Sequence, residues 1–116
     1  MNLLLVEDNE ELNTLLTEML SLQGHTVTQA HSAEAALAEL GQGTAVDLVL
    51  TDIGLPSMSG VVFAAEARAL RPDLGIVFMT GAVEAPRGDV GSPTLLRKPF
   101  TMQALESALA AAVAGR

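Results

Sequence analysis

Acidic, hydroxyl and basic side chains follow short apolar runs at four places in this chain. They are Glu7 and Asp8, then Asp52, then Thr80, and finally Lys98. Carboxylates that are brought together repel one another and need a counter-ion, and Mg²⁺ prefers oxygen ligands of this kind. An ammonium group can offset the negative charge on the oxygens of a phosphoryl group that moves onto a carboxylate, and a hydroxyl group can donate a hydrogen bond to them. These residue types therefore suit metal-assisted phosphoryl transfer, with a carboxylate as the nucleophile.

Asp52 is the candidate reacting group because of the stretch around it, VDLVLTDIGLPSMSG at residues 46–60. An apolar run ends at Asp52, and Gly54, Pro56 and Gly60 behind it are typical of a loop. A strand that ends in a carboxylate places this group at the carboxyl edge of a sheet, where ligands bind in open α/β folds.

The remaining sequence predicts alternating strands and helices. Strands are expected at residues 3–6, 26–30, 46–51, 75–79 and 94–97. Helices are expected after the capping residues Asn9, Ser32 and Thr101, and at residues 60–70. This alternation implies right-handed βαβ units and a three-layer α/β/α sandwich with a parallel sheet. Residues 82–93 hold two prolines and two glycines, so we expect a shortened or irregular fourth helix there.

Composition narrows the class of protein. The 116 residues suit one domain, residues 1–116, and 49% of them are hydrophobic but only 3% aromatic, which predicts an aliphatic core. The absence of cysteine excludes disulfides and thiol chemistry. A net charge of −8 argues against direct nucleic-acid binding. No apolar run reaches the roughly 20 residues of a membrane span, and no signal peptide is evident, so we expect a cytoplasmic protein.

Taken in order, the residues at the strand ends resemble the receiver domain of two-component response regulators. The resemblance rests on Glu7-Asp8, on Asp52 with Pro56 and Gly60 behind it, on Thr80, and on Lys98-Pro99-Phe100. Each motif is weak alone, but their joint order covers nearly the whole chain. The resemblance implies a flavodoxin-like, chemotaxis-regulator-like sheet of strand order 2-1-3-4-5.

The resemblance also implies roles for these residues. Asp52 would accept a phosphoryl group from the phosphohistidine of a sensor histidine kinase or histidine phosphotransfer protein. Glu7, Asp8, Asp52 and the backbone carbonyl of Gly54 would hold Mg²⁺. Lys98 would pair with the phosphoryl oxygens, Thr80 would hydrogen-bond them, and the Lys98–Pro99 bond would be cis. The phosphorylated domain, a monomer or weak dimer, would then change its contacts with a downstream protein. It would stand alone or form part of a hybrid kinase or longer regulator.

The chain departs from the family pattern in two ways. Leu95 replaces the aromatic residue that usually stands three positions before the lysine, which questions a switch based on an aromatic side chain. The interval from Thr80 to Lys98 is also shorter than usual and rich in helix-breaking residues, so the usual output face would be altered.

The residues two positions beyond Asp52 and Thr80 are small, namely Gly54 and Ala82. We therefore expect poor shielding of the phosphoryl group from water and a short-lived phosphorylated state.

Two other functions remain open. A pseudo-receiver would keep the fold but never take phosphate, although the complete set of acids, threonine and lysine argues against it. A phosphohydrolase of the haloacid dehalogenase type would need a second aspartate where this chain has Gly54, and it would need a cap domain. The preferred interpretation is a signalling switch that assists only its own phosphorylation and dephosphorylation and is not a turnover enzyme.

Overall fold

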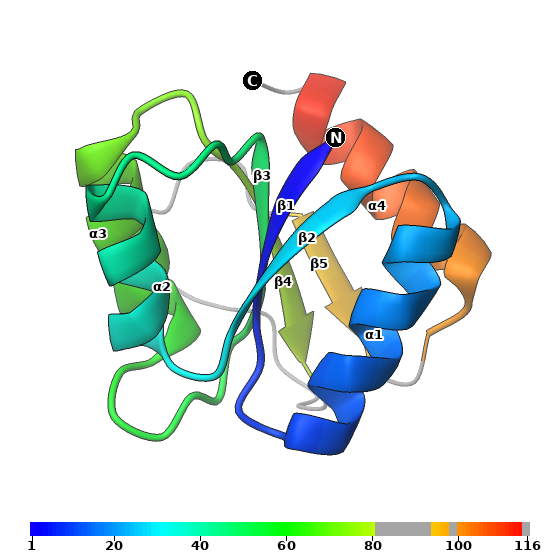
Figure 1. Cartoon of the computed structure of the whole chain (residues 1–116), viewed down its shortest axis with the longest axis horizontal. Coiled ribbons are helices and arrows are strands. Elements are labelled where there is room, and N and C mark those ends of the chain that lie inside the picture. The colour runs from blue at the N-terminus through cyan, green and yellow to red at the C-terminus, as the bar shows by residue number, and fades with distance from the viewer. Residues whose placement is uncertain (81–93, 98–99, 115–116) are drawn as a thin grey trace.

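The protein is a parallel β-sheet covered by helices on both faces (Figure 1). The computed structural model describes residues 1–80, 94–97 and 100–114. Its strands are β1 (Asn2–Val6), β2 (Thr26–Ala30), β3 (Leu48–Asp52), β4 (Gly75–Thr80) and β5 (Thr94–Arg97). Its helices are α1 (Glu10–Leu22), α2 (Ala33–Gly41), α3 (Gly60–Leu70) and α4 (Met102–Ala114). The sheet order is β2-β1-β3-β4-β5, which confirms the predicted sandwich and strand order.

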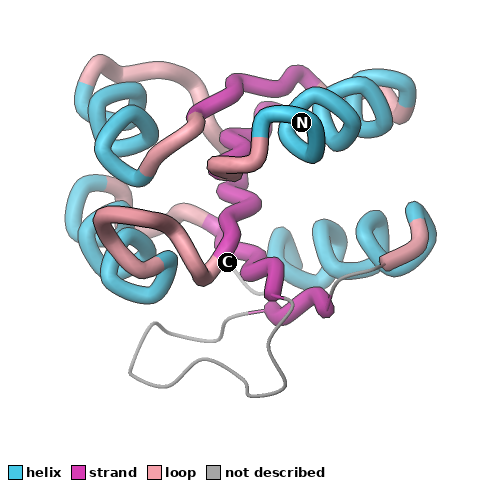
Figure 2. The backbone as a smooth tube through the Cα atoms, turned by 90° about the horizontal axis from the view of Figure 1, so that it is seen from below, coloured by secondary structure: helices cyan, strands magenta, loops and turns pink. Residues whose placement is uncertain are grey.

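Figure 2 shows the helices in two layers on opposite sides of the sheet. A largely aliphatic core lies between the sheet and each helix layer, and the one under α2 and α3 also contains Phe63 and Phe78. Successive side chains of a strand point to opposite faces of the sheet. In β1, Leu4 therefore packs with α2 and α3, whereas Leu3 and Leu5 pack with α1 and α4. The central strands are buried on both faces, which explains their continuous apolar runs.

The ends of the elements agree closely with the sequence. The side chains of Asn9, Ser32 and Thr101 each accept a backbone N–H at the start of a helix, at 3.0 Å, and this confirms the three predicted caps. The strand predicted at 46–51 begins later, at Leu48, and includes Asp52. The fourth strand likewise continues through Thr80. Both candidate site residues are therefore the last residues of their strands.

Helix α1 differs from its apolar pattern. The helical spacing of Leu12, Leu15, Leu16, Met19 and Leu20 predicts one apolar face, but Leu15 is 52% exposed while Leu16 and Leu20 are buried. The polar residue Asn13 is buried instead. In α4, the spacing predicts that Leu105, Leu109 and Val113 share one face; Leu105 and Leu109 are buried, but Val113 is 38% exposed. The predicted irregular helix within 82–93 and the predicted cis bond at Lys98–Pro99 lie outside the described residues.

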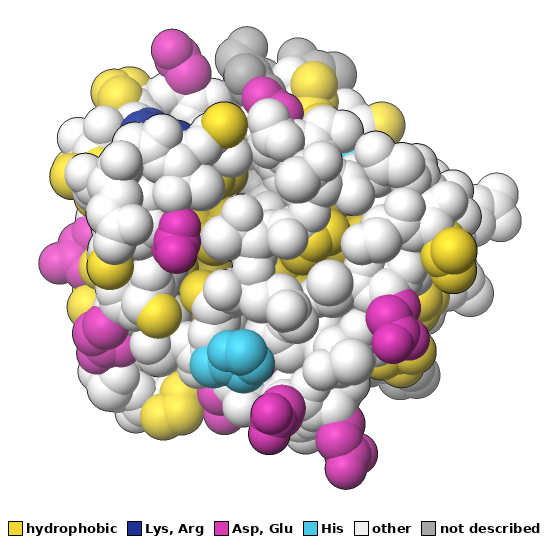
Figure 3. All heavy atoms as spheres, viewed as in Figure 1, with side chains coloured by type: hydrophobic (Ala, Val, Ile, Leu, Met, Phe, Trp, Pro, Cys, Tyr) yellow, Lys and Arg dark blue, Asp and Glu magenta, His cyan; other side chains and the backbone are white. Residues whose placement is uncertain are grey.

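Acidic side chains outnumber basic ones on the face of the molecule that Figure 3 shows. Asp and Glu side chains are scattered over it, and Lys or Arg is visible at only one place among the described residues of that face. Within the described ranges, no helix combines the length and apolarity that crossing a membrane requires.

Candidate functional site

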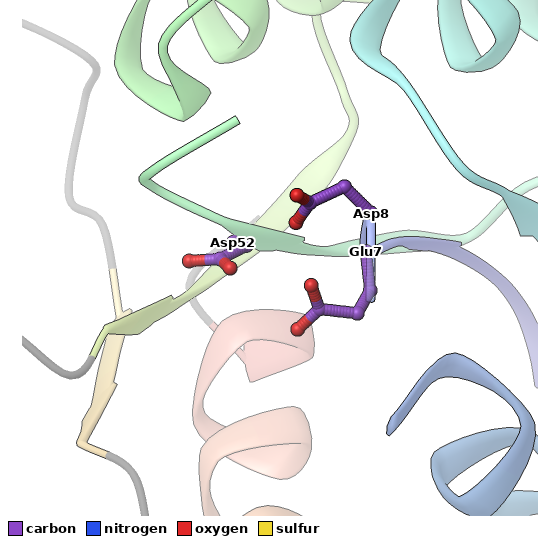
Figure 4. Close-up of side chains that lie close together, drawn as sticks. All are labelled: Glu7, Asp8 and Asp52. Carbon is purple, nitrogen blue, oxygen red and sulfur yellow. The ribbon is translucent and has the colours of Figure 1, made fainter. Parts of the chain in front are cut away.

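Three carboxylates meet at the carboxyl edge of the sheet. Val6 pairs with Thr51 in the register of β1 and β3, so the next residues along, Glu7 and Asp52, lie at neighbouring strand ends. One carboxylate oxygen from each of Glu7, Asp8 and Asp52 lies within 4.8 Å of the others. Figure 4 shows the side chains of Glu7 and Asp8 extending toward Asp52. We call these three residues the acid cluster.

The members of the acid cluster differ in their surroundings. Glu7 is 1% exposed, Asp52 is half-buried and Asp8 is exposed. Oε2 of Glu7 accepts the backbone N–H of Asn9 at 3.2 Å. Oδ1 of Asp52 accepts the backbone N–H of Gly54, also at 3.2 Å. The cluster therefore runs from a buried acid to an exposed one, and a ligand would reach it from the solvent side.

The donor atoms of the acid cluster suit a hard divalent cation. All three side chains offer carboxylate oxygens, and no softer nitrogen or sulfur ligand belongs to the group. Mg²⁺ is commonly bound by one or two carboxylates together with water and phosphate oxygens. Like charges this close repel one another, and a bound cation would offset that repulsion. The residues present therefore fit the predicted metal.

Thr80 and Lys98 were the other predicted site residues. Asp52 pairs with Met79 in the register of β3 and β4, so Thr80 lies one residue beyond this pair at the same edge. Thr80 is buried, at 3% exposure. It pairs with Arg97, the last residue of β5, and Lys98 follows directly but lies outside the described residues. The structure thus brings Thr80 to the strand ends and leaves Lys98 as a prediction.

Two hydrogen bonds hold the loop that follows Asp52, one between its two ends and one from its middle to α2. Gly60 begins α3, and its backbone N–H donates to the carbonyl of Ile53 at 2.7 Å. The hydroxyl of Ser57 donates to Glu34 of α2 at 2.6 Å, which lowers the pKa of that carboxyl below its ordinary value. The loop therefore holds a defined course next to Asp52.

Two contributions to the site were not predicted. The hydrogen bond between Ser57 and Glu34 was not predicted, because the sequence around Ser57 indicated only a loop and Glu34 had no distinguishing feature in the sequence. Asn13 lies on α1, and its side chain contacts the backbone at the end of β1. The one signal for Asn13 in the sequence was that a polar residue occupies a position in α1 where the helical spacing favours an apolar one.

Comparison with known proteins agrees with this geometry. The family model for the response regulator receiver domain matches residues 3–110. The response regulator receiver protein CpdR of Brucella abortus is 36% identical over 107 residues, which cover 89% of this chain and 88% of CpdR. The response regulator protein FleR of Pseudomonas aeruginosa is 39% identical over 108 residues. That match covers 88% of this chain but only 22% of FleR.

A solved structure extends the likeness to the whole fold. It is the response regulator protein TrrA of Thermotoga maritima, determined in complex with Mg²⁺-BeF, which is 27% identical and superposes with a TM-score of 0.83. The match covers 96% of this chain and 97% of TrrA. The family model alone spans most of the chain. This chain therefore belongs to the response regulator receiver domain family of two-component signal transduction.

Proposed function

We propose that this receiver domain accepts a phosphoryl group on Asp52 in a Mg²⁺-dependent reaction. The donor would be a phosphohistidine on a sensor histidine kinase or histidine phosphotransfer protein. The observation that carries the proposal is the acid cluster, three carboxylates within 4.8 Å at the end of the strand that holds Asp52. Neither the kinase nor the downstream target follows from this chain, so both are proposed only by class.

In this proposal, Glu7, Asp8, Asp52 and the backbone carbonyl of Gly54 hold the metal. When bound, Mg²⁺ supplies positive charge that offsets the negative charge of the phosphoryl oxygens. The carboxylates of Glu7 and Asp8 orient that charge beside Asp52. By the family resemblance, Asp8 would be a direct ligand and Glu7 a ligand through water.

The chemical step is a displacement at phosphorus. A carboxylate oxygen of Asp52 attacks the phosphorus atom, the phosphorus–nitrogen bond to histidine breaks, and its electron pair returns to the imidazole. The product is an aspartyl phosphate, and no further reactant is needed. Lys98 would offset charge on the phosphoryl oxygens, and the Thr80 hydroxyl would donate a hydrogen bond to them.

The phosphorylated state then acts as a switch and not as a step in turnover. The aspartyl phosphate carries about 1.5 to 2 negative charges in place of the single charge of the Asp52 carboxylate, in a region that is already acidic. Compensation requires Thr80 and Lys98 to draw toward the phosphoryl group, and this movement would alter the surface near β4 and β5. We propose that residues 1–116 act as one cytoplasmic domain, a monomer or weak dimer, with its output through another protein.

Intact-mass measurement tests the proposal. The protein is incubated with Mg²⁺ and a small phosphodonor, and the expected result is the addition of one phosphoryl group. The gain should disappear when the metal is chelated and in Asp52→Asn, and it should persist in Asp73→Asn, which changes an exposed aspartate outside the acid cluster.

The same experiment separates the alternative functions. A pseudo-receiver would gain no mass under any condition. A phosphohydrolase would hydrolyse many donor molecules per protein without accumulating one phosphoryl group on Asp52. Either outcome would contradict the proposal.

A further inference from the structure

Asn13 is a buried amide that uses all of its hydrogen-bonding capacity. Its side chain is fully buried in α1. Nδ2 donates to the carbonyl of Glu7 at 3.0 Å and to the carbonyl of Ala30 at 3.2 Å. Oδ1 accepts Nε2 of Gln29 at 2.7 Å and the hydroxyl of Thr17 at 3.4 Å. Both hydrogens and the oxygen are therefore satisfied.

The bond to Glu7 fixes the peptide group between two members of the acid cluster. The carbonyl oxygen that Asn13 binds belongs to the peptide joining Glu7 to Asp8. On its other side, the backbone N–H of Glu7 donates to the carbonyl of Ala30 at 3.1 Å. Glu7 lies one residue beyond β1, and its backbone is held there by the bond from its N–H to β2 and by the bond from Asn13 to its carbonyl.

Packing alone does not account for an amide at this position. Burying a polar side chain is unfavourable unless it is fully hydrogen-bonded, and the neighbouring buried positions of α1 are leucines. Leucine has the same number of side-chain heavy atoms and the same branching at Cγ as asparagine, and its apolar side chain needs no hydrogen-bond partner when it is buried. The amide adds a donor aimed at one peptide, and rotation of that peptide would swing the side chains of Glu7 and Asp8 relative to Asp52.

We propose that Asn13 is a positioning residue for the cation site. It holds the Glu7–Asp8 peptide so that both carboxylates face Asp52. This inference rests on the proposed function, because it assumes that the acid cluster binds Mg²⁺. Groups that orient metal ligands without touching the metal commonly change its affinity by about 10 to 100-fold when they are removed.

The competing explanation is that Asn13 only anchors α1 to the sheet. Its loss would then lower stability without changing the affinity of the folded protein for Mg²⁺. Thr17→Val is a matched control, because the Thr17 hydroxyl donates to the carbonyl of Asn13 at 2.8 Å and touches neither Glu7 nor Asp8. Both variants lose hydrogen bonds of the same network, but only Asn13→Leu frees the Glu7–Asp8 peptide.

Isothermal titration of the unphosphorylated protein with Mg²⁺ tests the inference. Asn13→Leu should raise the Kd by about tenfold relative to wild type, whereas Thr17→Val should stay within about twofold. If Asn13→Leu does not fold, Asn13→Ser keeps one donor in a smaller side chain and should also raise the Kd. Equal affinity of the folded Asn13 variant and wild type would overturn the inference, as would equal weakening in Thr17→Val. If wild type itself binds no Mg²⁺, the proposed function fails together with this inference.

Discussion

Gly60→Ala should destabilise the protein although alanine is the better helix former. A Cβ at position 60 would overlap the backbone oxygen of Asp52 and lie 2.8 Å from Cα of Ile53. Both are backbone atoms at the end of β3, so no side chain can move aside. The φ angle of Gly60 is not positive. The glycine is therefore required for close approach and not for its backbone conformation.

The magnitude follows from two opposing effects. Forcing extra atoms into a closely packed site costs typically about 1 to 3 kcal/mol. Replacing glycine by alanine inside a helix gains roughly 0.5 to 1 kcal/mol, and less at the first helical position, where Gly60 lies. The steric cost is the larger, so we expect a net loss of about 1 to 2 kcal/mol in the free energy of unfolding. The loop that carries Asp52 into α3 should shift as well.

Urea denaturation followed by circular dichroism measures this loss, with Gly41→Ala as the matched control. Gly41 also lies in a helix, but a Cβ there would meet nothing within 4 Å. This control should be stabilised by at most about 0.5 kcal/mol, because only the gain in helix propensity applies and Gly41 is the last residue of α2. A Gly60→Ala variant as stable as the wild type, beside a stabilised control, would refute the close approach of α3 to Asp52.

Three further predictions concern the acid cluster and the loop beside it. Asp8→Asn should raise the Tm in the presence of a chelator, because it relieves repulsion among like charges, and it should reduce the rise in Tm caused by Mg²⁺. Gly54→Arg should lengthen the half-life of the phosphorylated state by about tenfold, which corresponds to about 1.4 kcal/mol in the barrier to dephosphorylation. The larger side chain has room, because a Cβ at Gly54 meets nothing within 4 Å. An unchanged half-life, measured by intact mass, would contradict the role of poor shielding from water. Ser57→Ala should raise the pKa of Glu34 toward its ordinary 4.5, as measured by NMR titration. The lowered pKa of Glu34 stabilises the folded protein at pH values above 4.5, and this contribution is lost as the pH falls through the lowered pKa. An unchanged pKa in Ser57→Ala would exclude the Ser57 hydroxyl as the cause of the shift.

Local chemistry made much of the fold predictable. Each buried strand is a continuous apolar run because helices cover both faces of the sheet. The side chains of Asn9, Ser32 and Thr101 cap three of the helices, so the starts of these helices could be predicted from the residue types alone. The acid cluster was predictable as well, because parallel strands bring their carboxyl ends to one edge of the sheet.

Other features depend on contacts between distant residues and have no local signal. Asn13 is buried because its partners Glu7, Ala30 and Gln29 come from neighbouring strand ends, and the helical spacing favoured Leu15 for the core instead. The requirement for Gly60 also arises in three dimensions, from the approach of α3 to β3. The sequence predicted the helix that begins at Gly60, but nothing in it indicated that this position has no room for a side chain.

Chemical trapping of the phosphorylated residue tests the central claim most directly. An aspartyl phosphate is reduced by borohydride to homoserine, which marks the acceptor permanently and can be located by peptide mass spectrometry. After incubation with Mg²⁺ and a small phosphodonor, homoserine should be found at position 52 alone, and it should be absent when the metal is chelated. Homoserine at another aspartate, or none in a protein shown to be folded, would contradict the assignment of Asp52 as the phosphoryl acceptor.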